Sequence, residues 1–496
     1  MSSMNQDNVI EFESGLDPNR WKALAVIAIA SLMVVLDASI VNIALPQAQK
    51  ALHISNANRQ WVVTAYSLAF GSLLLFGGRL SDFIGRKRIF MIGLGGFAFA
   101  SAIGGLSQTS SELFAARAVQ GAFGALLAPA ALSLISVTFT IPKERAKAFG
   151  VYGAISGGGA AIGLIMGGLL TEYANWRWCL LVNTPIAILA ILLAIPFIRE
   201  SRAQGDRSYD IPGTIISSLG LVSLVYGCAQ AATHGWGNIH TYIFFIISAV
   251  LLAIFSYVET KTTHPLLPLR IFTERNRGGS YLSAFLVGAG LFAIFLFLSI
   301  YFQQFLGYSS LRSGFAFLPF SGGIIAFAGV ASQLLPKIGP RPLMTIGLLA
   351  AVVGLWLFSH LTDHSHYASQ ILPAMIITAS GIALFFIPSA STGLHNAGEH
   401  DTGVASAVLN TSQQIGGSLG AALLNTVAIS STTSYFISHI AKNGKGASAN
   451  AIASVHGFDI AFLTGAAFLF VAAVASFALI NVGKESVVEN PSGAMI

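Results

Sequence analysis

Residues 23–45 read A-L-A-V-I-A-I-A-S-L-M-V-V-L-D-A-S-I-V-N-I-A-L, and this stretch alone predicts the class of structure. A helix needs about 20 consecutive apolar residues to cross roughly 30 Å of hydrocarbon, and the stretch is long enough to do so. Its one charged residue, Asp37, lies well inside the apolar run. The stretch therefore predicts a transmembrane helix with a carboxylate near the middle of the membrane.

The rest of the chain has the same character. Of 496 residues, 54% are hydrophobic and only 9% are charged, whereas about a quarter of the residues of a soluble domain are charged. We predict an all-α polytopic membrane protein, because a lipid-exposed backbone must satisfy its own hydrogen bonds. Fourteen apolar blocks are the expected transmembrane helices: 23–45, 61–78, 89–106, 113–138, 148–171, 179–198, 211–231, 240–258, 280–304, 313–335, 342–360, 370–391, 404–429 and 458–481.

Basic residues set the orientation of these helices. If the N-terminus is cytoplasmic, 19 of the 26 Lys and Arg residues fall in cytoplasmic loops and six, Arg59 among them, fall in outer loops. The positive-inside rule then predicts that both termini are cytoplasmic. The net charge of +6 is explained by this loop charge, and we expect no nucleic-acid partner.

The chain also repeats itself. The segment G-R-L-S-D-F-I-G-R-K-R-I-F-M-I-G-L from Gly78 has a weaker counterpart, S-Q-L-L-P-K-I-G-P-R-P-L-M-T-I-G-L, from Ser332. Other matched pairs in the same order are Gly163 with Gly416, Gly167 with Gly420, and Pro129 with Pro388. Two parallel six-helix halves with two inserted helices are therefore expected. The expected segments are 1–22 (cytoplasmic), 23–198 (first bundle), 199–279 (linkers and inserted helices), 280–481 (second bundle) and 482–496 (cytoplasmic tail), and the Ala- and Ser-rich stretch 431–457 is predicted to be a linker.

Two charges lie where charge is costly. Asp37 is in the first predicted helix and Arg117 is near the start of the fourth. A charge at mid-membrane normally faces a partner or a water-filled path. One interpretation is an inert ion pair between the two residues. The interpretation we favour is a proton-binding carboxylate whose protonation competes with an approaching cation.

The loop between the second and third predicted helices carries an acid among four basic residues. Asp82 precedes the third helix and can interact with its N-terminus and with Arg86 or Lys87. Gly78 and Gly85 allow close backbone approach on either side. A simple turn whose basic residues only orient the helices in the membrane would explain the arginines and the lysine. It would not explain the positions of Asp82 and of the two glycines.

This loop resembles the signature loop of the major facilitator superfamily. R-A-V-Q-G-A-F-G-A from Arg117 resembles the second motif of that family, and L-D-A-S-I-V-N-I-A-L-P, W-R-W-C-L-L-V-N-T-P and Y-F-Q-Q-F-L-G-Y-S resemble motifs of its fourteen-helix drug:proton antiporter branch. The resemblance covers nearly the whole chain. It implies the major facilitator fold, transport by alternating access, and a monomer that needs no cofactor beyond the proton gradient.

The resemblance also implies roles for particular residues. Asp82 with Arg86 would form a conformational latch in a motif that includes Gly78, Gly85 and Lys87, and Arg117 would share a proton-relay network with Asp37. The antiporter motif of the fifth helix is expected to supply packing glycines. The matching positions are Gly159, Gly163, Gly167 and Gly168, with Leu164 where the motif has proline.

Substrate contacts are predicted on helices that line the central cavity of such a fold. Aromatic rings suit lipophilic cations, and amides within a span need a partner or water. Most rings are nevertheless expected to face lipid or other helices, and the amides could tie helices together. The candidates are Asp37, Gln120, Phe295, Tyr301, Gln303, Asn410, Gln413 and Gln414.

Other chemistry is disfavoured. The sequence has no G-x-x-x-x-G-K-[ST] loop for ATP, its two cysteines are too few for a disulfide framework, and no nucleophile–base constellation stands out. The cluster His360, Asp363, His364 and His366 is interpreted as a solvated loop, so no metal site is predicted. We expect a proton-coupled exporter of small lipophilic, cationic compounds in a bacterial cytoplasmic membrane, or alternatively a dedicated exporter or symporter of one metabolite, rather than an enzyme.

Overall fold

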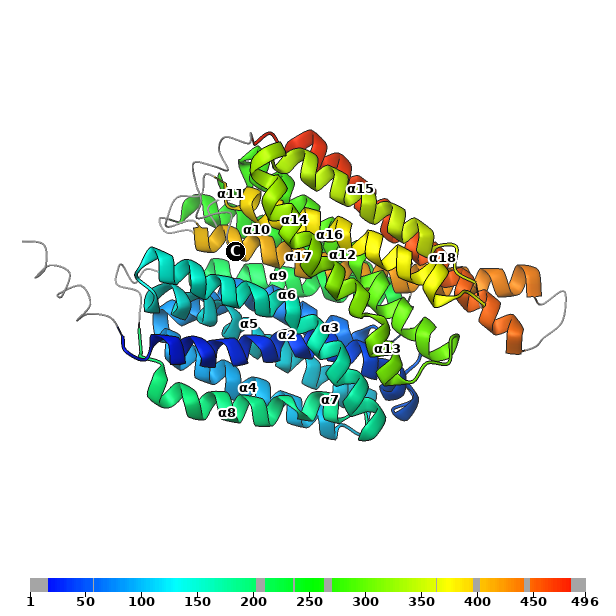
Figure 1. Ribbon diagram of the computed structural model, residues 1–496, viewed down its shortest axis with the longest axis horizontal. Coiled ribbons are helices and arrows are strands. Elements are labelled where there is room, and N and C mark those ends of the chain that lie inside the picture. Colours follow the sequence, from blue (N-terminus) through cyan, green and yellow to red (C-terminus); the bar gives the residue numbers. More distant parts are fainter. Residues whose placement is uncertain are drawn as a thin grey trace, which may run out of the picture.

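The computed structural model of the chain is helical, and Figure 1 shows the long helices running side by side along the long axis of the molecule. The structure describes residues 17–56, 58–201, 210–234, 237–262, 270–362, 364–395, 402–440 and 447–482. Each of the fourteen apolar blocks overlaps a helix in this part of the chain. The all-helical prediction is confirmed for the described residues.

The helices fall into three groups along the sequence. The first group is α2 (Arg20–Ala51), α3 (Trp61–Ile84), α4 (Arg86–Leu106), α5 (Ser110–Thr138), α6 (Pro142–Tyr173), α7 (Trp178–Leu181) and α8 (Asn183–Phe197). The second is α9 (Ile211–His234), α10 (Ile239–Lys261) and the short α11 (Arg270–Thr273). The third is α12 (Arg275–Gln304), α13 (Ser310–Ala316), α14 (Leu318–Ile338), α15 (Pro340–Phe358), η1 (Tyr367–Ile371), α16 (Leu372–Gly393), α17 (Thr402–Tyr435), η2 (Phe436–Ile440) and α18 (Ala447–Leu479).

Length and composition identify candidate membrane-spanning segments. Among the described residues, ten helical segments are long and apolar enough to cross a membrane, and α3, α6 and α9 contain shorter apolar stretches. Their outward faces are apolar, with Ile246 on α10 62% exposed, as expected for side chains whose solvent is lipid. The count of fourteen crossings stays a prediction.

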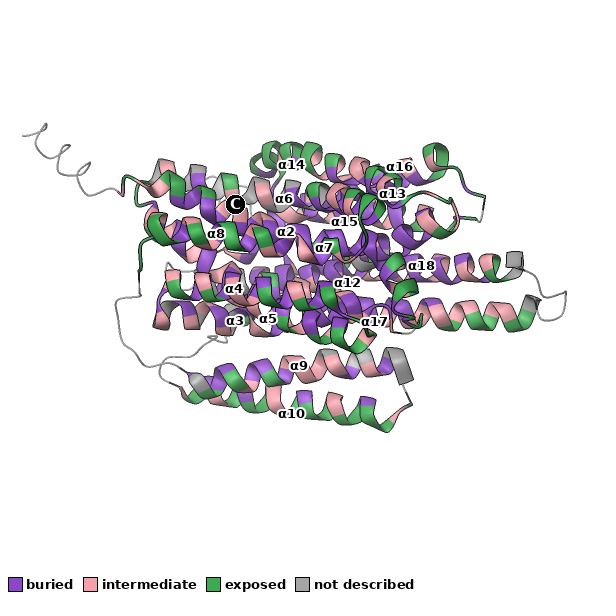
Figure 2. Cartoon of the chain, turned by 90° about the horizontal axis from the view of Figure 1, so that it is seen from below, coloured by how far each residue is buried: buried purple, intermediate pink, exposed green. Residues whose placement is uncertain are grey.

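The first and third groups form two bundles. Helices α2 to α8 pack around buried side chains such as Phe90, Phe97 and Ile135, and α12 to α18 pack around Phe297, Phe358 and Phe462. Helix α9 contacts α3 of the first bundle and α17 of the second, and α10 lies on the far side of α9 (Figure 2). The second group therefore flanks the junction of the two bundles.

Two glycines occupy equivalent places in the two bundles. Gly85 separates α3 from α4 with φ of 126°, and Gly339 separates α14 from α15 with φ of 82°. A side chain at such positive φ clashes with the backbone, so glycine is the residue that permits these tight connections. The pair has the offset found in the repeated sequence segments, so the repeat has a structural counterpart.

The helix crossings repeat as well. A Cβ atom on Gly163 or Gly167 of α6 would lie 2.9 Å from a carbonyl oxygen of α2, at Leu36 and Ile40 respectively. A Cβ atom on Gly416 or Gly420 of α17 would lie 1.9 and 2.3 Å from carbonyl oxygens of α12. Small residues allow backbones to approach this closely. The α2–α6 and α12–α17 crossings therefore correspond.

The molecule has two distinct ends. We call the end with the start of α2 and the end of α18 the terminal end, and the opposite end, with the loops 52–60 and 305–309, the distal end (Figure 1). At the distal end the bundles are joined by hydrogen bonds, which run from Ser299 Oγ to Asn42 O (2.7 Å), from Gln303 Nε2 to Ile43 O (3.1 Å), from Gln47 Nε2 to Ser310 Oγ (3.2 Å) and from Leu311 N to Glu172 Oε2 (2.9 Å). The structure is therefore closed at its distal end.

The predicted linker at 431–457 is wrong in its described parts. Helix α17 continues to Tyr435 and into η2, and α18 begins at Ala447. The two helices extend beyond the rest of the molecule at the distal end (Figure 1). The Ala- and Ser-rich composition suggested a linker, but alanine is the strongest helix former. Asp459 lies within α18.

Candidate functional site

The first bundle holds a buried ion pair. Asp37 on α2 is completely buried and Arg117 on α5 is 1% exposed, and Arg117 Nη1 lies 2.6 Å from Asp37 Oδ2. Taking two charges out of water is costly, and losing one partner leaves an uncompensated buried charge. The predicted partnership of these two residues is therefore present in the structure as a direct contact.

Amide side chains complete the surroundings of the Asp37 carboxylate. Gln120 Nε2 donates to Asp37 Oδ1 (2.8 Å) and to Ser101 Oγ (2.7 Å), while Gln120 Oε1 accepts from Arg117 (2.6 Å). Asn183 Nδ2, at the start of α8, donates to Asp37 Oδ1 at 2.8 Å. Hydrogen bonds to a carboxylate stabilise its ionised form. The carboxylate thus receives donors from two amides as well as from Arg117.

Arg117 has two further contacts that fix its position. Its Nε donates to the carbonyl oxygen of Val62 at 2.9 Å, and its guanidinium lies 4.5 Å from the centre of the Tyr66 ring. Both residues belong to α3, so the cation touches α2, α3 and α5. A change in the charge of Asp37 would therefore alter the forces among several helices.

Asn183 was not predicted as a site residue. It lies in the segment W-R-W-C-L-L-V-N-T-P, which entered the sequence analysis only through a resemblance. The available signal was an amide inside an apolar block, the same signal that selected Asn410 and Gln413. Gln120, which is predicted as a substrate contact together with Asp37, lies in the Asp37 cluster.

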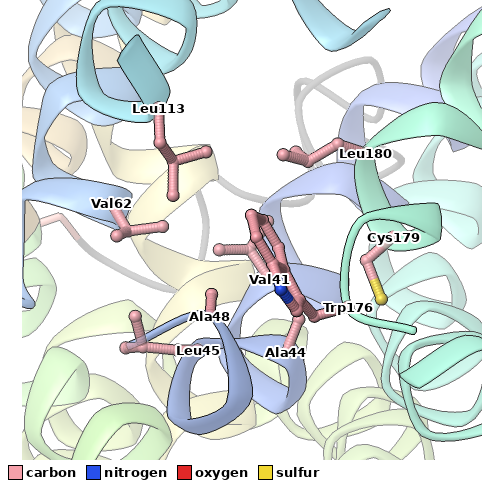
Figure 3. A pocket seen from close by; sticks show the side chains of 9 residues that line it. All are labelled: Val41, Ala44, Leu45, Ala48, Val62, Leu113, Trp176, Cys179 and Leu180. Carbon is pink, nitrogen blue, oxygen red and sulfur yellow. The ribbon is translucent and has the colours of Figure 1, made fainter. Parts of the chain in front are cut away.

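A small apolar space lies on the distal side of Asp37. A cavity of about 10 Å³ is lined by side chains of α2, α3, α5 and the α7 region, and Figure 3 shows them: Val41, Ala44, Leu45, Ala48, Val62, Leu113, Trp176, Cys179 and Leu180. A space of this size holds at most about one water, and an apolar lining keeps such a space dry. Hydrophobic side chains therefore lie distal to Asp37 along this side of α2.

A larger cavity lies in the second bundle, toward the terminal end. Its volume is about 240 Å³, and α12, α16 and α17 contribute its walls: Ala284, Phe386, Ile387, Ser389, Ala390, Leu394, Leu409, Asn410 and Gln413. The predicted residues Asn410 and Gln413 are among them. Asp37 and Gln120 belong to the other bundle and do not line this space.

The remaining substrate candidates are placed elsewhere. Gln414 lies against Gly71 of α3, where the two bundles meet. Phe295 packs against Phe317 and Phe320. Tyr301 is buried and its hydroxyl donates to the carbonyl of Thr362, and Gln303 is one of the groups that join the bundles at the distal end.

The signature loop is organised by Glu200. Its carboxylate accepts from the backbone N–H groups of Lys87 (3.1 Å) and Arg88 (3.2 Å), at the N-terminus of α4 where an anion is favoured. Lys87 Nζ donates to Ile195 O (2.7 Å), and Arg86 N donates to Ser201 O (3.0 Å). Position 82 lies in the last turn of α3 rather than in the loop, and the Asp82 side chain lies outside the described part of the structure, as does Asp363.

The glycines of α6 serve two contacts. Gly159, Gly163 and Gly167 face α2, at Val35, Leu36 and Ile40. Gly168 faces Leu311 at the start of α13, in the other bundle. Gly78 of α3 lies near Pro129 of α5. Leu164 of α6 is fully buried, and its carbonyl oxygen lies against Gly314.

Comparison with known proteins is consistent with this architecture. Residues 27–421 match the family model of the Major Facilitator Superfamily. The chain is 45% identical over 484 residues, 97% of its own length and 95% of the relative, to the puromycin resistance protein pur8 of Streptomyces alboniger. It is 36% identical over 415 residues, 83% of its length and 85% of the relative, to the cephamycin export protein CmcT of Amycolatopsis lactamdurans.

Solved structures share the fold. The crystal structure of a bacterial homologue of the human lysosomal transporter Spinster covers 96% of this chain and 99% of its own, with a TM-score of 0.68 and 16% identity. The human organic anion transporter MFSD10 gives a TM-score of 0.58 at 14% identity, covering 93% of this chain and 100% of its own. From its sequence and its fold together, the chain belongs to the major facilitator superfamily of membrane transporters.

Proposed function

We propose that this chain is a proton-coupled antiporter that exports small lipophilic, cationic compounds by alternating access. In this proposal fourteen helices cross the cytoplasmic membrane of a bacterium, both termini are cytoplasmic, and the distal end faces outward. The observation that carries the proposal is the buried Asp37–Arg117 pair. A charged pair inside the membrane is retained at a cost in free energy, and proton transfer is a use that requires an ionisable group there.

The geometry suggests how a proton would act. A proton that binds Asp37 converts the anion to a neutral acid, so the attraction to Arg117 is lost and the two amide donors lose a charged acceptor. Arg117 keeps its contacts with Gln120 and Val62. Because these groups belong to α2, α3, α5 and α8, protonation would favour a different packing of the first bundle. Release of the proton to the cytoplasm would restore the pair.

The substrate is proposed to bind in the cavity of the second bundle. Phe386 offers an aromatic ring, and Asn410 and Gln413 offer amide groups, a combination typical of sites for small, largely apolar ligands. Several relatives are named for drug resistance or export, including the tetracenomycin C resistance and export protein and the multidrug resistance protein Stp. The loop around Asp82, Arg86 and Lys87, with Gly78 and Gly85, is proposed to act as a conformational latch. A monomer in the bilayer is the proposed working unit, with the proton gradient as its energy source.

A dedicated exporter of one compound is the second candidate. Relatives are named for single antibiotics such as puromycin, cephamycin and lincomycin. Leu164 also stands where the antiporter motif has proline. The breadth of the substrate range separates the two proposals.

Purified protein in liposomes with an imposed pH gradient tests them. Native protein should move ethidium or puromycin against the proton flow, and Asp37→Asn should bind the compound without moving it. Transport of puromycin but not of ethidium would favour the dedicated exporter. Equal transport by native protein and Asp37→Asn would show that Asp37 is only structural and would refute the proposed proton site.

A further inference from the structure

The loop before α3 carries a buried arginine. Arg59 is only 5% exposed, although its position in an outer loop predicted a solvated charge. Its Nε donates to Oδ1 of Asn425 on α17 at 3.3 Å. The two residues are 366 positions apart in sequence and belong to different bundles. The contact therefore crosses the junction that must open if the distal end is to open.

Both ends of the Asn425 amide contact that loop. Asn425 is completely buried, and its Nδ2 donates to Gln60 Oε1 at 2.7 Å and to the carbonyl oxygen of Asn56 at 3.3 Å. The carbonyl side of the amide thus faces Arg59, and the amino side faces Gln60 and Asn56. One side chain of the second bundle is held by three residues of the first.

Two aromatic rings also lie near the Arg59 guanidinium. It lies 6.0 Å from the ring centres of Phe297 and of Phe458, both in the second bundle. Burial lowers the pKa of Arg59 from its usual value to about 10, so the side chain is still charged at neutral pH. A cation removed from water needs hydrogen-bond acceptors, because an unsatisfied buried charge is costly. Asn425 supplies a neutral acceptor for it.

We propose that Arg59 and Asn425 form a lock that sets the balance between the closed and the open distal end. They act as positioning residues and contact no substrate. When α17 moves away from the loop, Arg59 regains water, so the charge favours opening while the amide contact favours closure. The charge of Arg59 and its contact with Asn425 therefore act in opposite directions. This inference rests on alternating access as proposed above.

The sign of each substitution follows from that balance. Asn425→Leu keeps Arg59 buried in the closed state but removes its acceptor, so opening should be favoured. Arg59→Leu removes the charge that prefers water, so closure should be favoured. Replacing both partners by apolar groups removes the unpaired charge, although Gln60 Oε1 and the Asn56 carbonyl still lose the Asn425 donor. The double variant should therefore be more closed than Asn425→Leu.

Distances between spin labels at the distal end measure this balance. Labels at Lys50→Cys on α2 and Ser430→Cys on α17, both exposed positions, would be placed in protein whose two native cysteines are replaced by alanine. Asn425→Leu should lower the ratio of closed to open molecules at least tenfold, or about 1.4 kcal/mol. Arg59→Leu should raise the ratio. Arg312→Leu is the matched control, because Arg312 is an exposed arginine at the same end that faces Tyr308 of its own bundle.

Two results would overturn the lock. An unchanged distance distribution in Asn425→Leu would show that the Asn425 amide does not stabilise the closed distal end. A double variant as open as Asn425→Leu would show that the effect comes from the other lost contacts of the Asn425 side chain rather than from an unpaired charge. The measurement uses neither substrate nor pH gradient. The lock can therefore fail while liposomes still show antiport, and the antiport proposal can fail while the variants still shift the distances as expected.

Discussion

Replacing Arg117 with leucine should remove the cation that faces Asp37 and leave the Asp37 carboxylate buried without its counter-ion. Arg117 also donates to Gln120 and to the Val62 carbonyl, so these acceptors lose a donor as well. Breaking one partner of a buried ion pair costs about 3–5 kcal/mol. We expect the free energy of unfolding, measured by SDS titration in mixed micelles, to fall by about that amount.

The companion variant separates charge from packing. In Arg117→Leu/Asp37→Asn the remaining side chain is neutral, so a large part of the lost stability should return. Arg88→Leu is the control, because the ion pair of Arg88 with Glu200 is longer, at 3.7 Å, and its arginine side chain is 61% exposed. Such exposed pairs contribute about 0–1 kcal/mol. A loss below 1 kcal/mol in Arg117→Leu, or a double variant no more stable than the single one, would refute the reasoning.

Three further changes test other contacts. Gly85→Ala places a Cβ atom at φ of 126° and 2.6 Å from Glu200 Oε1, so the same titration should show a loss of about 1–3 kcal/mol, and native stability would contradict the strain. Gly314→Leu places side-chain atoms against the Leu164 carbonyl, where a Cβ alone would lie 2.5 Å away. It should shift the distances between spin labels at Lys50→Cys and Ser430→Cys toward the open distribution, unlike Gly322→Leu, which meets no neighbour at its Cβ. Gln413→Leu removes an amide from the proposed substrate cavity and should weaken ethidium binding up to about tenfold, with stability unchanged; unaltered binding would place the substrate elsewhere.

Much of the site could be predicted because charge is rare in apolar blocks. Asp37 and Arg117 were found by that rule, and their contact followed because each needs a partner. Asn183 obeys a weaker form of the rule, since an amide is less costly to bury than a charge and many amides tie helices together. Nothing in the sequence separates the amides that reach Asp37 from those that line the second cavity. That distinction depends on how the helices are rotated.

Contacts between distant loops were harder to predict. Arg59 was counted among the outer loop charges, where its type and position fit a solvated residue. Its burial depends on Asn425, and no local pattern links the two residues. Glu200 likewise lies at the start of α4, a helix end for which the sequence analysis named only Asp82. Glu200 reaches the start of α4 because the chain after α8 returns to that helix end, which is a property of the tertiary fold.

One helix connects the two ends of the proposed mechanism. Asp37 lies on α2 only five residues before Asn42 and six before Ile43, whose carbonyls accept from Ser299 and Gln303 of the other bundle. At 1.5 Å per residue that separation is about 8 Å along a continuous helix. The same stretch of α2 packs on Gly163 and Gly167, which have no side chain that could move aside. A shift of α2 caused by a proton at Asp37 would therefore be carried to the distal contacts as a rigid movement, and a loss of those contacts would be felt at Asp37. This physical continuity is why we place proton binding and opening of the distal end in one coupled step.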